Sequence, residues 1–221
     1  MALEVAMDEL AEKLGIDPIE LRVRNEPDRV PGDPTKKFSD RNLVRCLREG
    51  AERFGWNRRN AKPAQVRDGH WLVGMGVSAG YRAAPITKSA ARVRLDGEGR
   101  VVVETDMTDI GTGSYTILAQ TAAETMGVPL ERVKVILGDS DLPASSGSGG
   151  QWGAASSTAG VYAACVSLRR KVGEKLGFDG DAATFADGRI RAGERTFALK
   201  DAGELSAEDQ MEIGDFMKEY D

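Results

Sequence analysis

The order of sequence patterns along the chain predicts an α+β fold. Near the N-terminus, Leu3, Ala6, Leu10 and Leu14 recur at spacings of three and four, which is typical of an amphipathic helix. From about residue 70 the apolar period changes to two, which is typical of strands. We therefore expect N-terminal helices, followed by a mixed or antiparallel sheet with helices packed on it.

The overall composition is that of an ordinary globular chain. Apolar residues make up 41% and charged residues 29% of its 221 residues. No stretch approaches the roughly 18 consecutive apolar residues that a membrane span needs, so the sequence excludes a transmembrane protein. The net charge of −5 argues against a nucleic-acid-binding protein, which needs a basic surface.

Cysteine and histidine are too scarce for several kinds of site. Cys46 and Cys165 are too few for a disulfide scaffold or for the four thiolates of an iron–sulfur cluster. The single histidine, His70, excludes a histidine-rich metal site, and we expect it to be structural or solvent-facing. Cys165 lies among small apolar residues and is expected to be buried, whereas a reactive thiol at Cys46 is a minor alternative.

Two helices and a loop are predicted at the start of the chain. The first helix ends near Gly15. Asp17 and Pro18 are an N-cap and a first-turn proline, so a second helix is expected over residues 19–24. Residues 25–37 contain three prolines and are predicted to form a loop.

The next segments pass from helix to strand. Ser39 or Asp40 is expected to cap a third helix, which completes an N-terminal helical segment over residues 1–60. Residues 71–82 then have the pattern of a strand that is interrupted by several glycines.

The middle of the chain predicts a hairpin, a helix and a further strand. Residues 90–95 and 100–105 alternate around the turn dipeptide Asp96-Gly97. Residues 115–126 have helical spacing, and residues 133–137 have the pattern of a buried strand.

The last third contains a long helix, a weak hairpin signal and an acidic end. Small residues predict a helix over 155–175, and residues 188–199 predict a short hairpin. Residues 61–200 are expected to form the α+β part of the molecule. Residues 201–221 contain eight acidic residues and one lysine, so we expect a separate acidic segment, either a solvated helix or a frayed tail.

The first candidate site is a glycine-containing turn over residues 109–116. It follows a strand pattern and opens a helix, where unpaired backbone N–H groups and the helix dipole favour anions. Thr116 stands where a dinucleotide fingerprint needs its third glycine. A tight turn without any ligand therefore remains the alternative.

The second candidate site is the glycine- and serine-rich stretch over residues 138–160. No Lys or Arg occurs between Lys134 and Arg169, so an anionic ligand here would be held by backbone N–H groups and hydroxyls. A flexible surface loop has a similar composition and remains the alternative.

Four stretches, taken in order, carry a family pattern. They are residues 2–11 with 15–25, residues 50–56, residues 109–116 with Gln120, and residues 138–165. Together they resemble the molybdenum-binding large subunit of the xanthine dehydrogenase and aldehyde oxidase family, in particular its bacterial aldehyde oxidoreductase branch.

This resemblance implies a function and its partners. It implies that the chain is part of a larger molybdenum-binding domain whose cofactor is a molybdopterin cytosine dinucleotide with molybdenum. The implied reaction is hydroxylation of aldehydes or N-heterocycles with water-derived oxygen. The implied partners are the remainder of the large subunit and separate iron–sulfur and flavin subunits, with no nucleic acid and no membrane.

The resemblance also marks cofactor-binding residues. Those in the first turn are Gly111, Thr112 and Gly113. Those in the second stretch are Ser148, Gly149, Gly150 and Gln151. The family's catalytic glutamate lies in a Gly-x-Gly-Glu loop, which this sequence lacks, so no catalytic or metal-ligating residue is predicted here.

Three interpretations follow from these patterns. The chain is expected to be an internal section of the large subunit, inactive alone. A stand-alone, non-catalytic module that binds cofactor or docks a partner is the main alternative, and a split enzyme is another. Uncovered apolar surface would make the isolated section self-associate. The chain shows no signal peptide pattern, and either a cytoplasmic or a periplasmic location is expected.

Overall fold

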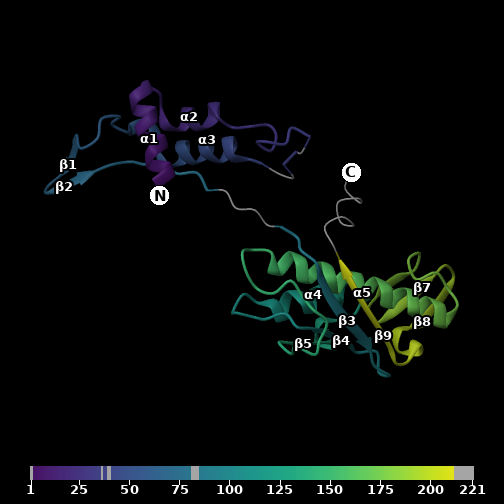
Figure 1. Ribbon diagram of the computed structural model, residues 1–221. Helices are drawn as coiled ribbons and strands as arrows, with labels where there is room; N and C mark the ends of the chain where they lie inside the picture. The colour runs from purple at the N-terminus through teal and green to yellow at the C-terminus, as the bar shows by residue number, and fades with distance from the viewer. Residues whose placement is uncertain (1, 36, 39–40, 81–84, 212–221) are drawn as a thin grey trace. The chain divides into compact units, whose positions relative to one another are not determined.

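The computed structural model describes residues 2–35, 37–38, 41–80 and 85–211, and it divides the chain into two compact units (Figure 1). Unit 1 is Met1–Arg82 and unit 2 is Ala83–Asp221. Helices precede mixed and antiparallel sheets, so the predicted α+β class is confirmed. The boundary between the two units lies after residue 82, whereas the sequence analysis expected the segments 1–60, 61–200 and 201–221. Those segments stay a prediction.

Unit 1 begins with the predicted helices, α1 (Ala2–Leu14), α2 (Pro18–Arg24) and α3 (Leu43–Phe54), followed by a short 3-10 turn, η1 (Trp56–Arg58). Asp17 caps α2 as predicted, because its Oδ1 accepts the N–H of Ile19 at 2.8 Å. The expected caps of α3, Ser39 and Asp40, lie outside the described residues, and α3 itself begins at Leu43.

Arg22 ties the first two helices to the end of unit 1. Its side chain is buried and its guanidinium donates to Glu4 Oε2 at 2.8 Å and to Asp8 Oδ1 at 3.0 Å, both on α1. The same oxygen of Glu4 accepts the N–H of Ala79 at 2.8 Å. A buried guanidinium with several acceptors is satisfied only when all these segments are in place.

The remaining strands of unit 1 are shorter than predicted. β1 (Val66–Asp68) and β2 (Trp71–Val73) form an antiparallel hairpin whose six residues are all exposed. The predicted strand over 71–82 is wrong beyond Val73, because residues 74–80 have no regular pairing, and residues 81–82 lie outside the described residues. His70 is exposed in the turn between the two strands.

Unit 2 is built on a mixed four-stranded sheet. Its strands are β3 (Ser89–Leu95), β4 (Val101–Thr105), β5 (Val133–Leu137) and β9 (Leu205–Met211), in the order β5-β4-β3-β9. β3 and β4 form the predicted antiparallel hairpin, with Val93 opposite Val103. β5 is parallel to β4 and is a half-buried edge strand rather than the buried strand expected.

Two helices pack on one face of this sheet (Figure 1). They are α4 (Ser114–Met126) and α5 (Gly153–Leu176), both close to their predicted limits. Their inner faces supply Leu118, Met126 and Leu168 to one continuous apolar core. Cys165 is buried there as expected, and burial raises the pKa of its thiol to about 12, so it stays protonated and unreactive.

A second, small sheet follows α5. It consists of β6 (Thr184–Ala186), β7 (Arg189–Ala192) and β8 (Arg195–Ala198), so the predicted hairpin is present and has a third strand. Short 3-10 turns precede β5 and β9, at η2 (Leu130–Arg132) and η3 (Leu199–Ala202).

The acidic end of the chain contains a strand of the main sheet. β9 pairs with all seven residues of β3, so a solvated helix or frayed tail is wrong for residues 205–211. Ala207 is buried while Glu208 is exposed and pairs with Arg92 of β3 at 2.8 Å. Glu208 therefore lies on the solvent face of a paired strand, and half-buried Asp209 lies on the other face, where it accepts the hydroxyl of Ser167 from α5. Residues 212–221 lie outside the described residues.

Gly127, which ends α4, offers a test of packing in unit 2. Its φ is +62°, and an added Cβ would lie 2.2 Å from the carbonyl carbon of Phe185, a backbone atom. We expect Gly127→Ala to lower the free energy of unfolding by about 3 kcal/mol, because a left-handed alanine is strained and the backbone must also move apart.

Gly177 is a matched control, because it ends α5 with φ +75° and nothing within 4 Å of an added Cβ. Gly177→Ala should cost only about 1 kcal/mol, the conformational part alone. Urea unfolding of both variants, followed by circular dichroism, gives the two values. Equal losses would contradict the packing explanation.

The Glu4 contact predicts a pH dependence in unit 1. The N–H of Ala79 and the guanidinium of Arg22 hold the pKa of Glu4 below its ordinary value of 4.5. Because the pKa is lower in the folded state, this contact stabilises the fold fully above about pH 4.5 and less as the pH falls through the folded value. The amide proton shift of Ala79, followed by NMR, should titrate with a midpoint below 4.5.

Glu4→Gln should abolish that titration and cost about 2 kcal/mol at neutral pH, the range for a hydrogen bond to a charged group. Glu12→Gln, an exposed change on the same helix, should leave the titration of Ala79 intact. Loss of the Ala79 titration in the Glu12 variant would show that the signal does not come from Glu4.

Candidate functional site

The first glycine turn lies where β4 leads into α4. Gly111 and Gly113 have φ values of +92° and +81°, which glycine adopts without strain. The side chain of Asp109 is the acceptor at the centre of the turn. Its Oδ1 accepts the N–H of Gly111 at 2.8 Å and of Thr112 at 3.0 Å, and its Oδ2 accepts the N–H of Tyr115 at 3.3 Å.

Asp109 therefore occupies the anion position that the sequence analysis expected to be free. The N–H of Gly111 is the main cause that holds the pKa of Asp109 below its ordinary value, with further help from Tyr115 and Thr112. The expectation of unpaired N–H groups at this turn is wrong for Gly111, Thr112 and Tyr115. An aspartate two residues before the first glycine is the sequence signal that could have predicted this.

The second loop, residues 145–152, is attached directly to the first turn. The N–H of Ser145 donates to Asp106 Oδ1 at 2.6 Å. The hydroxyl of Ser148 donates to the carbonyl oxygen of Thr108, immediately before Asp109. Two segments separated by some forty residues in sequence are thus adjacent, so the structure brings the two predicted sets of site residues together.

Met107 is the buried centre of this junction. Its side chain is 2% exposed, and its sulfur lies 3.7 Å, 3.8 Å and 3.1 Å from the hydroxyl oxygens of Ser145, Ser148 and Ser157. Ser157 belongs to α5, so one thioether contacts both the second loop and the helix that follows it. The sequence analysis missed this residue, which has no motif of its own.

Trp152 explains why the second loop contains consecutive glycines. A Cβ on Gly149 would lie 2.7 Å from the indole ring, and one on Gly150 would lie 1.9 Å from it. The indole Nε1–H donates to the carbonyl oxygen of Ser146 at 3.1 Å, which closes the loop on itself. The absence of a side chain at both glycines thus allows the close approach of the tryptophan.

Gln151 has a backbone conformation that is rare for its residue type. Its φ is +73°, in the left-handed region, and its side chain is exposed. Strain of this kind is retained where the surrounding structure fixes the backbone, and it is common near functional sites.

The predicted site residues are accessible and offer uncharged donors. All seven are exposed or half-buried. Within the described part of the chain, no hydrogen bond engages the N–H groups of Gly149, Gly150 or Gln151. An added Cβ on Gly111 or Gly113 would meet no atom within 4 Å, so the space over the first turn is open. Neutral donors and open space suit a polar or anionic group of a cofactor.

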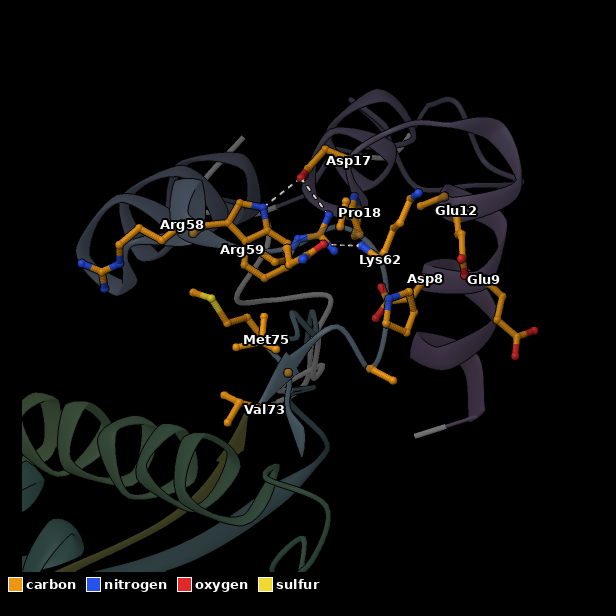
Figure 2. Close-up of a pocket in the computed structure, with 18 of the residues that line it drawn as sticks. Asp8, Glu9, Glu12, Asp17, Pro18, Arg58, Arg59, Lys62, Val73 and Met75 are labelled. Carbon is orange, nitrogen blue, oxygen red and sulfur yellow. Dashed lines mark hydrogen bonds and ion pairs between the residues drawn. The ribbon is translucent and has the colours of Figure 1, made fainter. Parts of the chain in front are cut away.

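Unit 1 contains a separate pocket of about 1060 Å³ (Figure 2). Asp17 lies on its wall, where Oδ2 accepts the indole N–H of Trp56 at 2.9 Å and the guanidinium of Arg59 at 3.5 Å. Arg59 also stacks over the Trp56 ring at 4.5 Å from its centre. These groups satisfy one another.

Neither a metal site nor a membrane span is found in the part of the chain that the structure describes. Within it, no group of three or more His, Cys, Asp or Glu side chains is arranged to hold a metal ion. No helix there has both the length and the apolar character needed to cross a membrane.

Sequence comparisons connect the chain to a known family. Residues 49–219 match the family described as the molybdopterin cofactor-binding domain. The aldehyde oxidoreductase molybdenum-binding subunit PaoC of Escherichia coli K12 is 60% identical over 223 residues, which cover 100% of this chain and 30% of that relative. The putative xanthine dehydrogenase molybdenum-binding subunit XdhA of the same organism is 34% identical over 61% of this chain and 19% of its own length.

Solved structures show the same fold. Quinoline 2-oxidoreductase from Pseudomonas putida 86 matches with a TM-score of 0.66 at 20% identity, over 96% of this chain and 32% of that chain. The chain thus spans about 30% of the length of the curated relatives that match it over its full extent. Since the family match covers most of the chain, the resemblance seen in the sequence is confirmed, and the chain belongs to the molybdopterin cofactor-binding domain family.

Proposed function

We propose that this chain is a section of the large subunit of a molybdenum hydroxylase, which oxidises aldehydes or N-heterocycles with water-derived oxygen. The section contributes two cofactor-binding loops. The aldehyde substrate class is supported by the 60% identity to the subunit named as that of an aldehyde oxidoreductase.

One observation carries this proposal. The first turn and the second loop were marked independently in the sequence, and the fold joins them through Ser148 and Met107. The second loop lies beside the N-terminal end of α5, where the helix dipole favours negative charge, while at the start of α4 Asp109 already supplies that charge. A surface built from two distant segments in this way is typical of a binding site rather than of a flexible linker.

We infer that Gly111, Thr112 and Gly113 and Ser148, Gly149, Gly150 and Gln151 would hold the cofactor, in the form of molybdopterin cytosine dinucleotide. When bound, the cofactor supplies the metal-centred oxidation. The chain's own residues supply uncharged N–H and hydroxyl donors on a preformed surface, so an anionic part of the cofactor would be held without a lysine or arginine from residues 135–168.

Turnover requires groups that this sequence does not contain. The family's Gly-x-Gly-Glu loop is absent from these 221 residues, so the general base would come from the remainder of the subunit. Iron–sulfur and flavin subunits are the proposed electron-transfer partners. The lack of that loop is also what favours the second candidate function, a stand-alone module that binds cofactor or docks a partner without catalysis.

The size of the natural polypeptide distinguishes these two functions. An immunoblot of the source cells with an antibody to this chain should detect a band about three times longer than the chain, since the chain spans 30% of its relatives. A band at 23.8 kDa would contradict the interpretation of the chain as a section of a larger subunit, and it would favour the stand-alone module.

The nucleotide that is released from the cofactor tests which dinucleotide form the subunit binds. Acid treatment of the purified complete subunit should release one cytidine nucleotide for each molybdenum. Release of a guanosine nucleotide, or of none, would contradict the cytosine dinucleotide.

Ser148→Ala tests whether the joined loops hold the cofactor. This change removes the hydroxyl that donates to Thr108 O, and it should reduce the cofactor retained by the complete subunit several-fold. It should cost no more than about 1 kcal/mol of stability, because a single half-exposed hydrogen bond is lost. Molybdenum content per subunit and the melting temperature give the two readouts.

Thr158→Ala is the matched control, because that hydroxyl donates only within α5, to Ala154 O at 2.9 Å and Ala155 O at 3.1 Å. It should leave the molybdenum content unchanged. Equal molybdenum loss in both variants would mean that the loops have no special role.

A further inference from the structure

Unit 1 exposes more large apolar side chains than it buries. In the described part of unit 1, the buried apolar residues are Ala11, Ile19, Leu21 and Leu47. The exposed ones are Leu3, Val5, Leu10, Leu14, Phe54, Val66, Trp71, Leu72 and Val73, with Trp71 at 76%. A two-stranded hairpin without a covered face is marginally stable in water at best. Part of this surface therefore needs a partner.

Residues 71–80 have the pattern of a strand, but only residues 71–73 are paired with another strand. Apolar residues alternate from Trp71 through Val73, Met75 and Val77, and the residues between them are small after Leu72. The same alternation is present in burial, since residues 75, 77 and 79 are half-buried and residues 74, 76, 78 and 80 are exposed. Yet the pairing stops at Val73.

The backbone of this segment makes few hydrogen bonds to the described part of the chain. Arg22 donates to the carbonyl oxygen of Val77 at 3.5 Å, and Ala79 N–H donates to Glu4, so one end of the segment is fixed. Within the described residues, no hydrogen bond engages the N–H groups of residues 74–78. An extended backbone with free donors and alternating apolar side chains is a template for strand addition.

A groove of suitable size lies beside this segment. It is the pocket of about 1060 Å³, with Val73 and Met75 on one side and α1 residues such as Asp8 on the other (Figure 2). From the strand spacing, the rise per residue and the sheet spacing, one extended residue fills roughly 160 Å³. The groove therefore has room for about six or seven residues of extended chain.

We propose that a strand from the remainder of the molybdenum-binding subunit pairs with residues 71–80 and fills this groove. The inference rests on the proposed function, in which these 221 residues are one section of a longer chain. The relative that is 60% identical carries about 70% of its length outside the matched region, which is ample to supply the strand. Alternating apolar side chains on that strand would cover Val73 and Met75.

Two other occupants are less well matched to the groove. Unit 2 exposes four large apolar side chains in its described part, Ile110, Tyr115, Leu130 and Tyr162, and they come from separate elements. A second copy of the chain would offer only the same two-stranded hairpin, which itself lacks a covered face. Both remain as outcomes that the experiment can detect.

Hydrogen exchange measured by mass spectrometry tests the proposal. The amides of residues 74–78 should exchange at unprotected rates in the 221-residue chain, and at least about a hundredfold more slowly in the complete subunit without its partner subunits. Rapid exchange in the complete subunit would overturn the proposal, as would protection that appears only after the partner subunits are added.

The other occupants give different results. Protection in the 221-residue monomer would assign the groove to unit 2, and protection that rises with concentration and dimer formation would assign it to a second copy. Either result overturns the proposal. The exchange measurement needs no cofactor, so its failure is distinct from failure of the proposed function, which the polypeptide size and molybdenum content decide.

Proline at consecutive positions adds a geometric test. Alternate N–H groups of a strand point to opposite edges, so one of Gly76→Pro and Val77→Pro should remove a donor from the new ladder. That variant should lose the protection of residues 74–78 in the complete subunit. Gly76→Ala and Val77→Ala are the controls, and an added Cβ at Gly76 meets nothing within 4 Å. Protection that survives both prolines would exclude a ladder.

Discussion

The close approach of helix α5 to strand β3 is the contact on which the candidate site depends. A Cβ added at Gly160 would lie 2.5 Å from the carbonyl oxygen of Ser89, so a larger residue would force helix and strand apart. The first turn of α5 is held by the same approach, because Ser156 Oγ accepts the N–H of Thr87 at 3.0 Å. Ser167 and Lys171 of α5 then bind β9, the edge strand next to β3. The loop that precedes α5 therefore ends at a point that is fixed against β3.

Local sequence patterns predicted most elements of the fold. They did not predict pairing between strands that lie far apart in the sequence. Helices α1, α2, α4 and α5 and the β3–β4 hairpin follow from spacing, caps and turn residues that act over a few positions. β9 was missed because its acidic composition outweighed a period of two, in which Ala207 is buried between exposed Ser206 and Glu208. Its partner, β3, lies more than one hundred residues earlier, and a pairing at that distance leaves no local signal. Residues 74–80 show the converse, a continued strand pattern that has no pairing partner among the described residues of unit 1.

The sequence marked the candidate site residues, and the structure gives several of them a role in the packing of their own loops. Gly149 and Gly150 are small because the Trp152 ring lies over them, and Gly111 lies in a turn that Asp109 organises. Met107 could not have been chosen, since an isolated methionine after a strand is usually a core residue. It is a core residue here too, at 2% exposure, but its sulfur also contacts hydroxyls of the second loop. Its role depends on the fold and on no motif.

The first turn and the second loop of the candidate site differ in the negative charge that they already contain. The N-terminal end of α4 carries roughly half a positive charge, and the carboxylate of Asp109 already balances it through Gly111, Thr112 and Tyr115. A second anion at that turn would have to displace the carboxylate or repel it. At the second loop the carboxylate of Asp106 accepts only the N–H of Ser145, and the N–H groups of residues 149–151, which have no partner among the described residues, lie beside the start of α5. In the proposed site, an anionic part of the cofactor would therefore be better accommodated at residues 148–151, and the open space over the first turn would suit an uncharged part.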